Sequence, residues 1–201
     1  IKRRIRSLRP NLSNEYSKVE SPIVETDVFK IENPKIIERI NNDITGGKPF
    51  HYIFFGTTGV GKTYLGTHIS IKCEERWEML SCISHYKEHI SFINSDYTDK
   101  MEADRKNDNK FSSNCLMIDD LGDEKPTTPA SHDYFSGLLE KRYLYIKRNN
   151  ISRTIITTNL KSEEIIAMYG SRVYDRICEH FIICKFNNDS FRKKNLQIIK
   201  G

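Results

Sequence analysis

The sequence predicts a three-layer α/β domain with a central parallel sheet. Short apolar runs of strand length alternate along the chain with segments of helical periodicity, which is the pattern of a parallel α/β sheet. The first run, residues 50–55, leads into a glycine-rich loop and then a helix. A later run, residues 115–118, ends in two adjacent aspartates. A phosphate-binding loop and acids at strand ends are typical of a P-loop nucleoside-triphosphatase fold.

The N-terminal arm, residues 1–27, carries most of the charge imbalance. Its first ten residues include five Lys or Arg and no acid, and the chain of 201 residues has a formal net charge of +5. The arm lacks sustained periodicity, so we predict an extended segment before an ATPase domain over residues 28–201. Such an arm is often a contact for nucleic acid or an acidic partner, or simply a solvated terminus. Because the chain begins with Ile1, we expect a preceding segment, with the arm as the remnant or linker of a partner-binding segment.

Composition favours a cytoplasmic protein. No run approaches the roughly 18 apolar residues of a membrane span, and no leader is visible. The five cysteines are odd in number and form no C-x-x-C pair, which favours reduced thiols. Cys82, His85 and His89 could bring three zinc-type ligands together on a helix. A fourth ligand is missing, and we favour a polar surface segment here.

The elements around the glycine-rich loop follow from local patterns. Residues 34–44 are predicted to form a short helix that ends at Gly46 and Gly47. The strand over residues 50–55 stops at Gly56. A helix should begin after the loop, because apolar residues recur every four positions and can lie on a sheet. These positions are Leu65, Ile69, Cys73 and Trp77.

The second half of the chain continues the alternation. Ile90 and Phe92 alternate with polar neighbours, as a second strand would, and the third strand is expected over residues 115–118. A long helix follows, with Thr128 as its cap and Pro129 at its first position. The remaining elements are a strand over residues 154–158, a helix from Ser162 closed by Gly170, a helix around Val173 and a strand over residues 181–186.

The loop GTTGVGKT, residues 56–63, satisfies the pattern G-x-x-x-x-G-K-[ST] in full. Its glycines let backbone amides wrap closely round phosphate oxygens, and Lys62 neutralises the β- and γ-phosphates. Thr63 offers a hydroxyl to Mg²⁺ at the N-terminus of the following helix. We therefore predict ATP and Mg²⁺ as ligands. The predicted ATP-binding residues of the loop are Gly56, Thr57, Thr58, Gly59, Val60, Gly61, Lys62, Thr63 and Tyr64.

Polar residues also end the third and fourth strands. Asp119 is predicted to bind Mg²⁺, and Asp120 to orient or activate the attacking water, although it is one methylene shorter than the usual Glu. Paired acids at a strand end can also simply begin a turn. The segment Thr157-Thr158-Asn159 is placed to reach the γ-phosphate or its water, whereas Asn at a strand end is usually a turn residue.

Five segments in order, GTTGVGKT, CLMIDDLGDEKPT, RTIITTNL, GSRVYDRI and NNDSFR, resemble the AAA+ ATPases of the DnaC and DnaI helicase loaders and the related IstB transposition ATPases. The resemblance runs from about Phe50 to Arg192. Its most specific part is the stretch after the double Asp, which includes Leu121, Gly122, Glu124, Lys125 and Pro126. It implies an AAA+ domain without a sizeable C-terminal helical lid, because only residues 193–201 follow Arg192.

The resemblance also implies site roles. Asn159 corresponds to the sensor of the γ-phosphate, and Arg192 to the second sensor at the ATP site. Arg176 corresponds to an arginine finger that reaches a neighbouring subunit's ATP, with Arg172 assisting it. Hydrolysis would then depend on assembly into a ring or spiral. The alternative for either arginine is a surface ion pair with Asp175 or Glu179, two acids nearby in the sequence.

The polar region over residues 96–110 corresponds to a family insertion that touches single-stranded DNA. Lys100, Arg105, Lys106 and Lys110 are the candidate phosphate contacts. Acids interleave with them, so a solvated mixed-charge segment is an equal alternative.

The resemblance implies a DNA-stimulated ATPase that loads a hexameric replicative helicase onto single-stranded DNA, either in a bacterium or as a phage protein in a bacterial host. Loaders of this family usually carry an N-terminal helicase-binding domain, whereas this chain shows a basic arm there. The first alternative is an IstB-like transposition ATPase that binds DNA and recruits a transposase. A nucleic-acid-binding adaptor with a merely structural nucleotide and a small-molecule kinase are alternatives of other classes.

Overall fold

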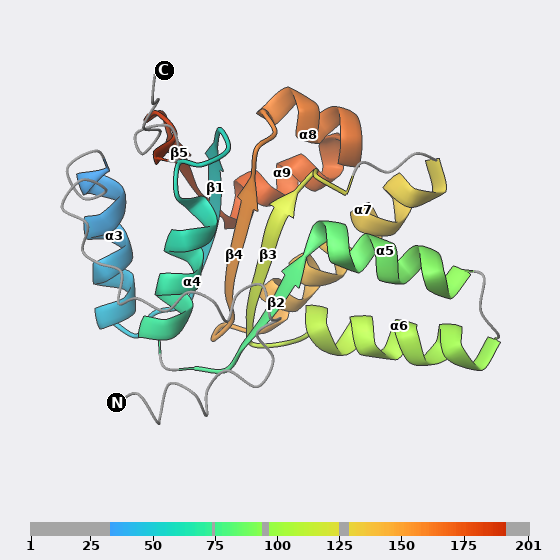
Figure 1. The fold of residues 1–201 in the computed structure, drawn as a ribbon. Coiled ribbons are helices and arrows are strands. Elements are labelled where there is room, and N and C mark those ends of the chain that lie inside the picture. Colours follow the sequence, from blue (N-terminus) through green and yellow to red (C-terminus); the bar gives the residue numbers. More distant parts are fainter. Residues whose placement is uncertain (1–32, 74, 94–96, 125–128, 192–201) are drawn as a thin grey trace, which may run out of the picture.

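One five-stranded parallel sheet organises the domain, with strand order β2-β3-β4-β1-β5 (Figure 1). The computed structural model describes residues 33–191 except 74, 94–96 and 125–128. The strands are β1 (Phe50–Gly56), β2 (Trp77–Ser81), β3 (Cys115–Leu121), β4 (Arg153–Thr158) and β5 (Ile182–Phe186). Because all the strands run the same way, their carboxyl ends meet at one edge.

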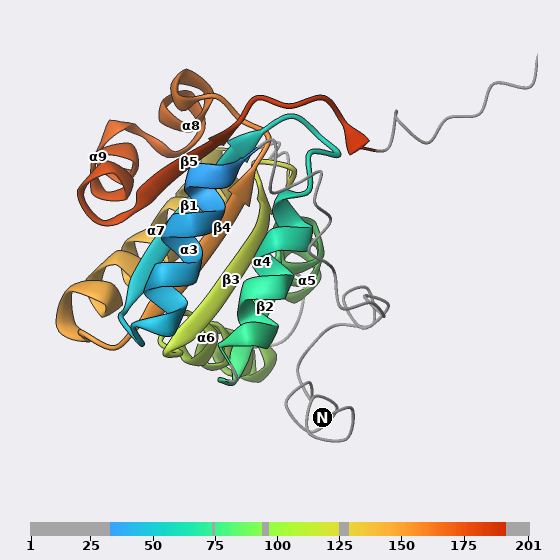
Figure 2. The ribbon, with the colours of Figure 1, turned by 90° about the vertical axis from the view of Figure 1, so that its left-hand side faces the viewer.

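Helices cover both faces of the sheet, which confirms the predicted three-layer architecture (Figure 2). The helices of one face are α3 (Pro34–Thr45) and α4 (Lys62–Lys72). Those of the other face are α5 (Cys82–Ile93), α6 (Tyr97–Phe111), α7 (Pro129–Arg148), α8 (Ser162–Tyr169) and α9 (Ser171–His180). Alternate residues of β1 explain this division, since Tyr52 and Phe54 pack under α3 and α4 while Ile53 and Phe55 face the opposite core.

The second strand is where the sequence-based prediction was wrong. Trp77 does not continue the apolar stripe of α4, because that helix ends at Lys72 and Trp77 begins β2. Ile90 lies in α5 instead of a strand and is 38% exposed. The buried residues of β2 are Trp77 and Leu80, and this three-residue spacing is as compatible with a helix as with a strand. The other predicted strands are confirmed, as are the helix that starts at Pro129 and the helix that Gly170 closes.

The stretch with the three zinc-type residues packs against α7. Cys82 and His85 are buried, so the expectation of a polar surface segment was wrong. The His85 Nε2 lies 3.0 Å from the Tyr134 hydroxyl, and the His89 ring stacks on Tyr134 with centroids 3.4 Å apart. Within the described residues, no three His, Cys, Asp or Glu side chains are grouped to hold a metal ion. Among the residues that the structure describes, no helix is both long and apolar enough to cross a membrane.

Arg142 of α7 fixes the starting ends of β3 and β4, opposite the glycine-rich loop. Its side chain is 1% exposed and donates hydrogen bonds to the carbonyl oxygens of Phe111 at 3.1 Å and Arg153 at 2.8 Å, and to the Thr154 hydroxyl at 2.9 Å. Burial lowers the pKa of Arg142 to about 10, so the guanidinium stays charged at neutral pH. A buried charge with this many acceptors fixes the segment before β3 and the first residues of β4.

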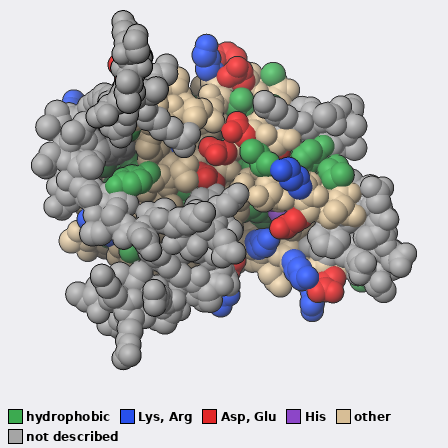
Figure 3. Space-filling model, in the orientation of Figure 1, with side chains coloured by type: hydrophobic (Ala, Val, Ile, Leu, Met, Phe, Trp, Pro, Cys, Tyr) green, Lys and Arg blue, Asp and Glu red, His purple; other side chains and the backbone are tan. Residues whose placement is uncertain are grey.

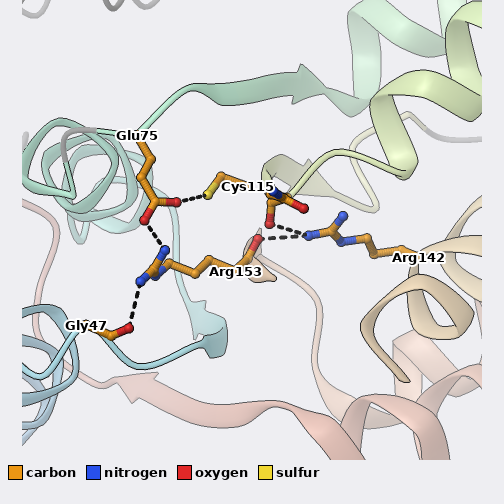
Figure 4. A network of polar contacts seen from close by, with 6 residues as sticks. Gly47, Glu75, Cys115, Arg142 and Arg153 are labelled. Carbon is orange, nitrogen blue, oxygen red and sulfur yellow. Dashed lines mark hydrogen bonds and ion pairs between the residues drawn. The ribbon is translucent and has the colours of Figure 1, made fainter. Parts of the chain in front are cut away.

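A second polar cluster continues from this arginine to the edge of the sheet (Figure 4). The Arg153 guanidinium forms an ion pair with Glu75 and donates to the Gly47 carbonyl oxygen at 3.1 Å. The same Glu75 accepts a hydrogen bond from the Cys115 thiol at 2.8 Å. These contacts join the first residues of β3 and β4 to the segments that precede β1 and β2, at the end of the sheet where the strands begin.

Replacing Arg142 by Met is expected to destabilise the domain by about 3 kcal/mol, because the change leaves buried carbonyl oxygens without a donor. Urea unfolding followed by circular dichroism measures this free energy. Lys141→Met is the matched control, since Lys141 is the adjacent residue but lies at the surface in an ion pair with Asp108. The control should cost much less. Equal losses in both variants would contradict the role of Arg142.

Candidate functional site

The glycine-rich loop connects β1 to α4 at the carboxyl edge of the sheet, as predicted. Gly61 has φ of 90° and lies immediately before α4, a conformation that few other residues tolerate. At Gly56 a side chain has no room, because an added Cβ would lie 2.8 Å from the Phe186 carbonyl oxygen of β5. The loop therefore has the backbone that close wrapping round phosphate oxygens requires.

Lys62 joins the loop to the end of β4. Its buried ammonium donates hydrogen bonds to the carbonyl oxygens of Gly56 at 2.7 Å and Thr57 at 3.0 Å. A third bond, 2.7 Å long, goes to the Asn159 Oδ1. Asn159 thus lies beside the lysine that the motif assigns to the β- and γ-phosphates, which is where a sensor of the terminal phosphate has to be.

Asp119 connects three elements through one oxygen atom. Its Oδ1 accepts hydrogen bonds from the Thr63 hydroxyl of α4 at 2.9 Å and from the Thr157 hydroxyl of β4 at 2.6 Å. The Thr157 oxygen in turn accepts a bond from the Asp120 backbone N–H at 2.9 Å. Mg²⁺ prefers a few carboxylate and hydroxyl oxygens together with phosphate oxygens. Thr63 and Asp119 offer that set of ligands side by side.

The two aspartates lie in a bulge of β3 that gives them different environments. Ile118 pairs with Ile156 and Leu121 with Thr158, so two residues of β3 stand opposite one residue of β4. Asp119 remains buried, while Asp120 is partly exposed and has φ of 54°. It is the only residue other than glycine with positive φ in the described part of the chain. The bulge gives adjacent carboxylates different environments, which fits one metal ligand and one group for water.

Sequence reasoning missed the role of Thr157. The sequence placed Thr157-Thr158-Asn159 towards the γ-phosphate, but among these residues only Asn159 contacts the glycine-rich loop. Thr157 supports Asp119 and Asp120, and the Thr158 hydroxyl donates to the Leu121 carbonyl oxygen at 2.7 Å. The parallel pairing of β3 with β4 determines these contacts, and a single sequence does not specify strand order.

An open hollow lies beside the loop, about 680 Å³ in volume and lined by residues 33–36, 185 and 187–189. The chain after β5 borders it, and the Phe191 backbone N–H donates to the Gly59 carbonyl oxygen at 3.0 Å. None of its lining residues belongs to the glycine-rich loop. The local sequence pattern did not indicate this hollow, because its walls come from opposite ends of the domain. Arg192, predicted as a further ATP contact, lies outside the described residues.

The two arginines of α9 share one acid. Glu140 Oε1 of α7 lies 2.9 Å from the Arg176 Nη1 and 3.2 Å from the Arg172 Nε. The partner is thus Glu140, and the alternative pairing with Asp175 or Glu179 was wrong. The Arg176 guanidinium also stacks 4.4 Å from the centre of the Tyr143 ring. The Arg176 side chain is 18% exposed and that of Arg172 is 73% exposed, so Arg176 is packed while Arg172 extends into solvent.

Acids accompany two of the four candidate DNA-binding cations. In α6, Lys106 pairs with Glu102 at 2.9 Å, and Lys110 lies 4.0 Å from Glu88 of α5. Arg105 is exposed, and the side chain of Lys100 lies outside the described residues. Figure 3 shows blue and red side chains next to each other over this part of the surface. The pattern is that of a mixed-charge helix rather than a uniformly basic strip.

This chain is similar to a curated protein and to several solved structures. No protein-family model matches the sequence. A protein of Bacillus thuringiensis subsp. berliner, named as an ATP-binding protein of insertion sequence IS232, is 26% identical over 148 residues. The match covers 71% of this chain and 56% of that protein, so the chain spans about half the length of this curated relative.

Solved structures with the same fold include those of the DnaC helicase loader and of DnaI. The DnaC helicase loader superposes with a TM-score of 0.61 at 18% identity, covering 87% of this chain and 100% of that one. DnaI gives 0.57 at 21% identity, covering 94% and 93%. Domain III of the Thermotoga maritima replication initiation protein DnaA gives 0.54 at 13% identity, covering 83% and 69%. The chain therefore shares the three-layer α/β fold of these structures, with a central parallel sheet as its sequence predicted.

Thr157→Val keeps the shape of the side chain and removes the hydroxyl that supports both aspartates. We expect the Mg²⁺ concentration for half-maximal binding of a fluorescent ATP analogue to rise roughly 10-fold, because residues that orient metal ligands have effects of this size. Thr158→Val is the matched control, since it removes an equally buried hydroxyl that donates to the Leu121 carbonyl oxygen and accepts from the Leu160 backbone N–H, whereas the Thr157 hydroxyl bonds both aspartates. Equal shifts in both variants would show that Thr157 has no special role at Asp119.

Proposed function

We propose that this protein binds and hydrolyses ATP with Mg²⁺, and that it loads a hexameric replicative helicase onto single-stranded DNA. The proposal rests on two hydrogen bonds at the carboxyl edge of the sheet. Lys62 donates to Asn159, and Thr63, the next residue in the chain, donates to Asp119. The likeness of the fold to the DnaC and DnaI structures supports the loader role.

The proposed chemistry assigns one task to each residue. The loop amides and Lys62 hold the phosphates, and Thr63 with Asp119 holds Mg²⁺. Asp120 orients the attacking water, and its position in the bulge beside Asp119 supports this role. Asn159 is within hydrogen-bonding distance of the Lys62 ammonium, so it is well placed to respond to the terminal phosphate. A carboxylate and an amide that position water are typical of nucleoside-triphosphate hydrolysis.

Assembly completes the proposed site. Arg176 and Glu140 belong to the layer of α7 and α9, whereas the loop and the aspartates lie at the carboxyl edge of the sheet. We therefore assign Arg176 to the ATP of a neighbouring subunit in a ring or spiral, with Arg172 assisting. An arginine supplied in this way stabilises charge that develops on the transferred phosphoryl group. Hydrolysis should then depend on protein concentration and on DNA that promotes assembly.

A transposition ATPase is the second candidate. The relative from insertion sequence IS232 supports it, because that protein belongs to a mobile element and is named for ATP binding. In this case the same ATP site would serve the recruitment of a transposase to DNA. The two candidates share the hydrolysis chemistry and differ in the macromolecular partner.

The partner separates the two candidates directly. Purified protein with ATP and Mg²⁺ should bind a hexameric replicative helicase and increase its loading onto a circular single-stranded DNA, measured by gel filtration and by unwinding of an annealed oligonucleotide. Lys62→Ala should abolish the increase. If the protein instead binds a transposase on duplex DNA and leaves helicase loading unchanged, the loader proposal is wrong and the transposition role replaces it.

Mixing two inactive variants tests the arginine supplied by a neighbour. Arg176→Ala should reduce ATP turnover by roughly 10³-fold, the size expected for loss of an arginine finger. Asp120→Asn should also be inactive, because it removes the carboxylate that orients the attacking water. A one-to-one mixture should recover about a quarter of the wild-type rate, because random assembly joins an intact site to an intact arginine at that frequency. The comparison mixture combines Arg172→Ala with Asp120→Asn, because Arg172 is the other arginine of α9 that contacts Glu140. No recovery in the first mixture would place Arg176 outside the neighbouring site.

A further inference from the structure

The turn after Asp120 is held tightly from two sides. The Asp123 backbone N–H donates to the Asp120 carbonyl oxygen at 3.0 Å, which closes the turn. Gly122 has φ of 101°, and a Cβ added there would lie 2.4 Å from a methyl carbon of Leu160. The turn is thus packed directly against the residue that follows Asn159, and it cannot shift in that direction.

Glu124 holds the same turn from inside the core. The residue is 5% exposed, and its Oε2 accepts a hydrogen bond from the Gly122 backbone N–H at 2.8 Å. Its Oε1 accepts a short hydrogen bond from the hydroxyl of Tyr169, the buried last residue of α8. Burial raises the pKa of Glu124, so keeping a carboxyl group here has a cost in stability. A residue needed only for packing would be apolar.

We propose that Glu124 is a positioning residue for Asp120. By fixing Gly122 through one oxygen and Tyr169 through the other, Glu124 maintains the turn that keeps Asp120 in its left-handed conformation. That conformation determines where the Asp120 carboxylate points. The inference rests on the proposed role of Asp120 in hydrolysis, and it adds a residue whose side chain touches neither nucleotide nor metal.

The test compares substitutions that differ in hydrogen bonding. In Glu124→Gln, the amide oxygen can accept from Gly122 and the amide nitrogen can donate to the Tyr169 oxygen, so kcat should stay within about threefold of wild type. Glu124→Leu removes both acceptors and should lower kcat roughly 30-fold, while the Kd for ATP stays within about twofold. Tyr169→Phe should lie between them.

Asp43→Leu is the matched control for lost stability. Asp43 is also a buried carboxylate that accepts a short hydrogen bond from a tyrosine, Tyr52, but it lies at the end of α3. The Asp43→Leu substitution should lower the free energy of unfolding, and kcat should stay unchanged at a temperature where the variant is folded. If Glu124→Leu keeps the wild-type kcat, or if Asp43→Leu lowers kcat equally, Glu124 has only a structural role.

Amide hydrogen exchange of Asp120 and Gly122 gives a readout that does not need hydrolysis. Both amides are hydrogen bonded, so Glu124→Leu should speed their exchange at least tenfold, and Glu124→Gln should not. Unchanged exchange at Asp120 in Glu124→Leu would overturn the positioning role. A wild-type protein without ATP turnover would contradict the proposed function instead, and the exchange measurement would still decide whether Glu124 fixes the turn.

Discussion

The site depends on one oxygen atom, the Oδ1 of Asp119. Thr63 donates to it from the start of α4 and Thr157 donates to it from β4, so three separate elements meet at a single acceptor. This contact requires β3 to lie next to β4 with both strands running in the same direction, and it requires the bulge that gives Asp119 and Asp120 different surroundings. Strand order, the bulge and the position of the glycine-rich loop are therefore coupled to one another through a single carboxylate.

Sequence patterns were sufficient to predict the positions of residues that lie at the ends of strands. The loop from Gly56 to Thr63 and the double aspartate lie at strand ends, and a parallel sheet brings such ends to one edge. Asn159 lies beside Lys62 for the same reason, because it follows the end of β4. The prediction failed at β2, which is short, lies at the edge of the sheet and buries residues at a helical spacing.

Contacts between residues distant in sequence could not be predicted. Glu140 as the partner of both arginines, and Tyr169 as the partner of Glu124, depend on how α7, α8 and α9 pack. Helical periodicity likewise does not reveal that Arg142 is buried because carbonyl oxygens before β3 and at the start of β4 accept its hydrogen bonds. Such partners follow from the packing of whole elements, which local propensity and spacing do not describe.

The contacts of Lys62 have a consequence for the energetics and kinetics of nucleotide exchange. Its ammonium has three protein acceptors, so a phosphate that binds there exchanges existing hydrogen bonds for new ones, and the net gain from this lysine is modest. Affinity must come largely from the loop amides and from the partial positive charge at the start of α4. When a nucleotide leaves, the protein acceptors can take back the ammonium at once. In the proposed binding mode, dissociation of a nucleotide therefore leaves no unpaired charge on Lys62.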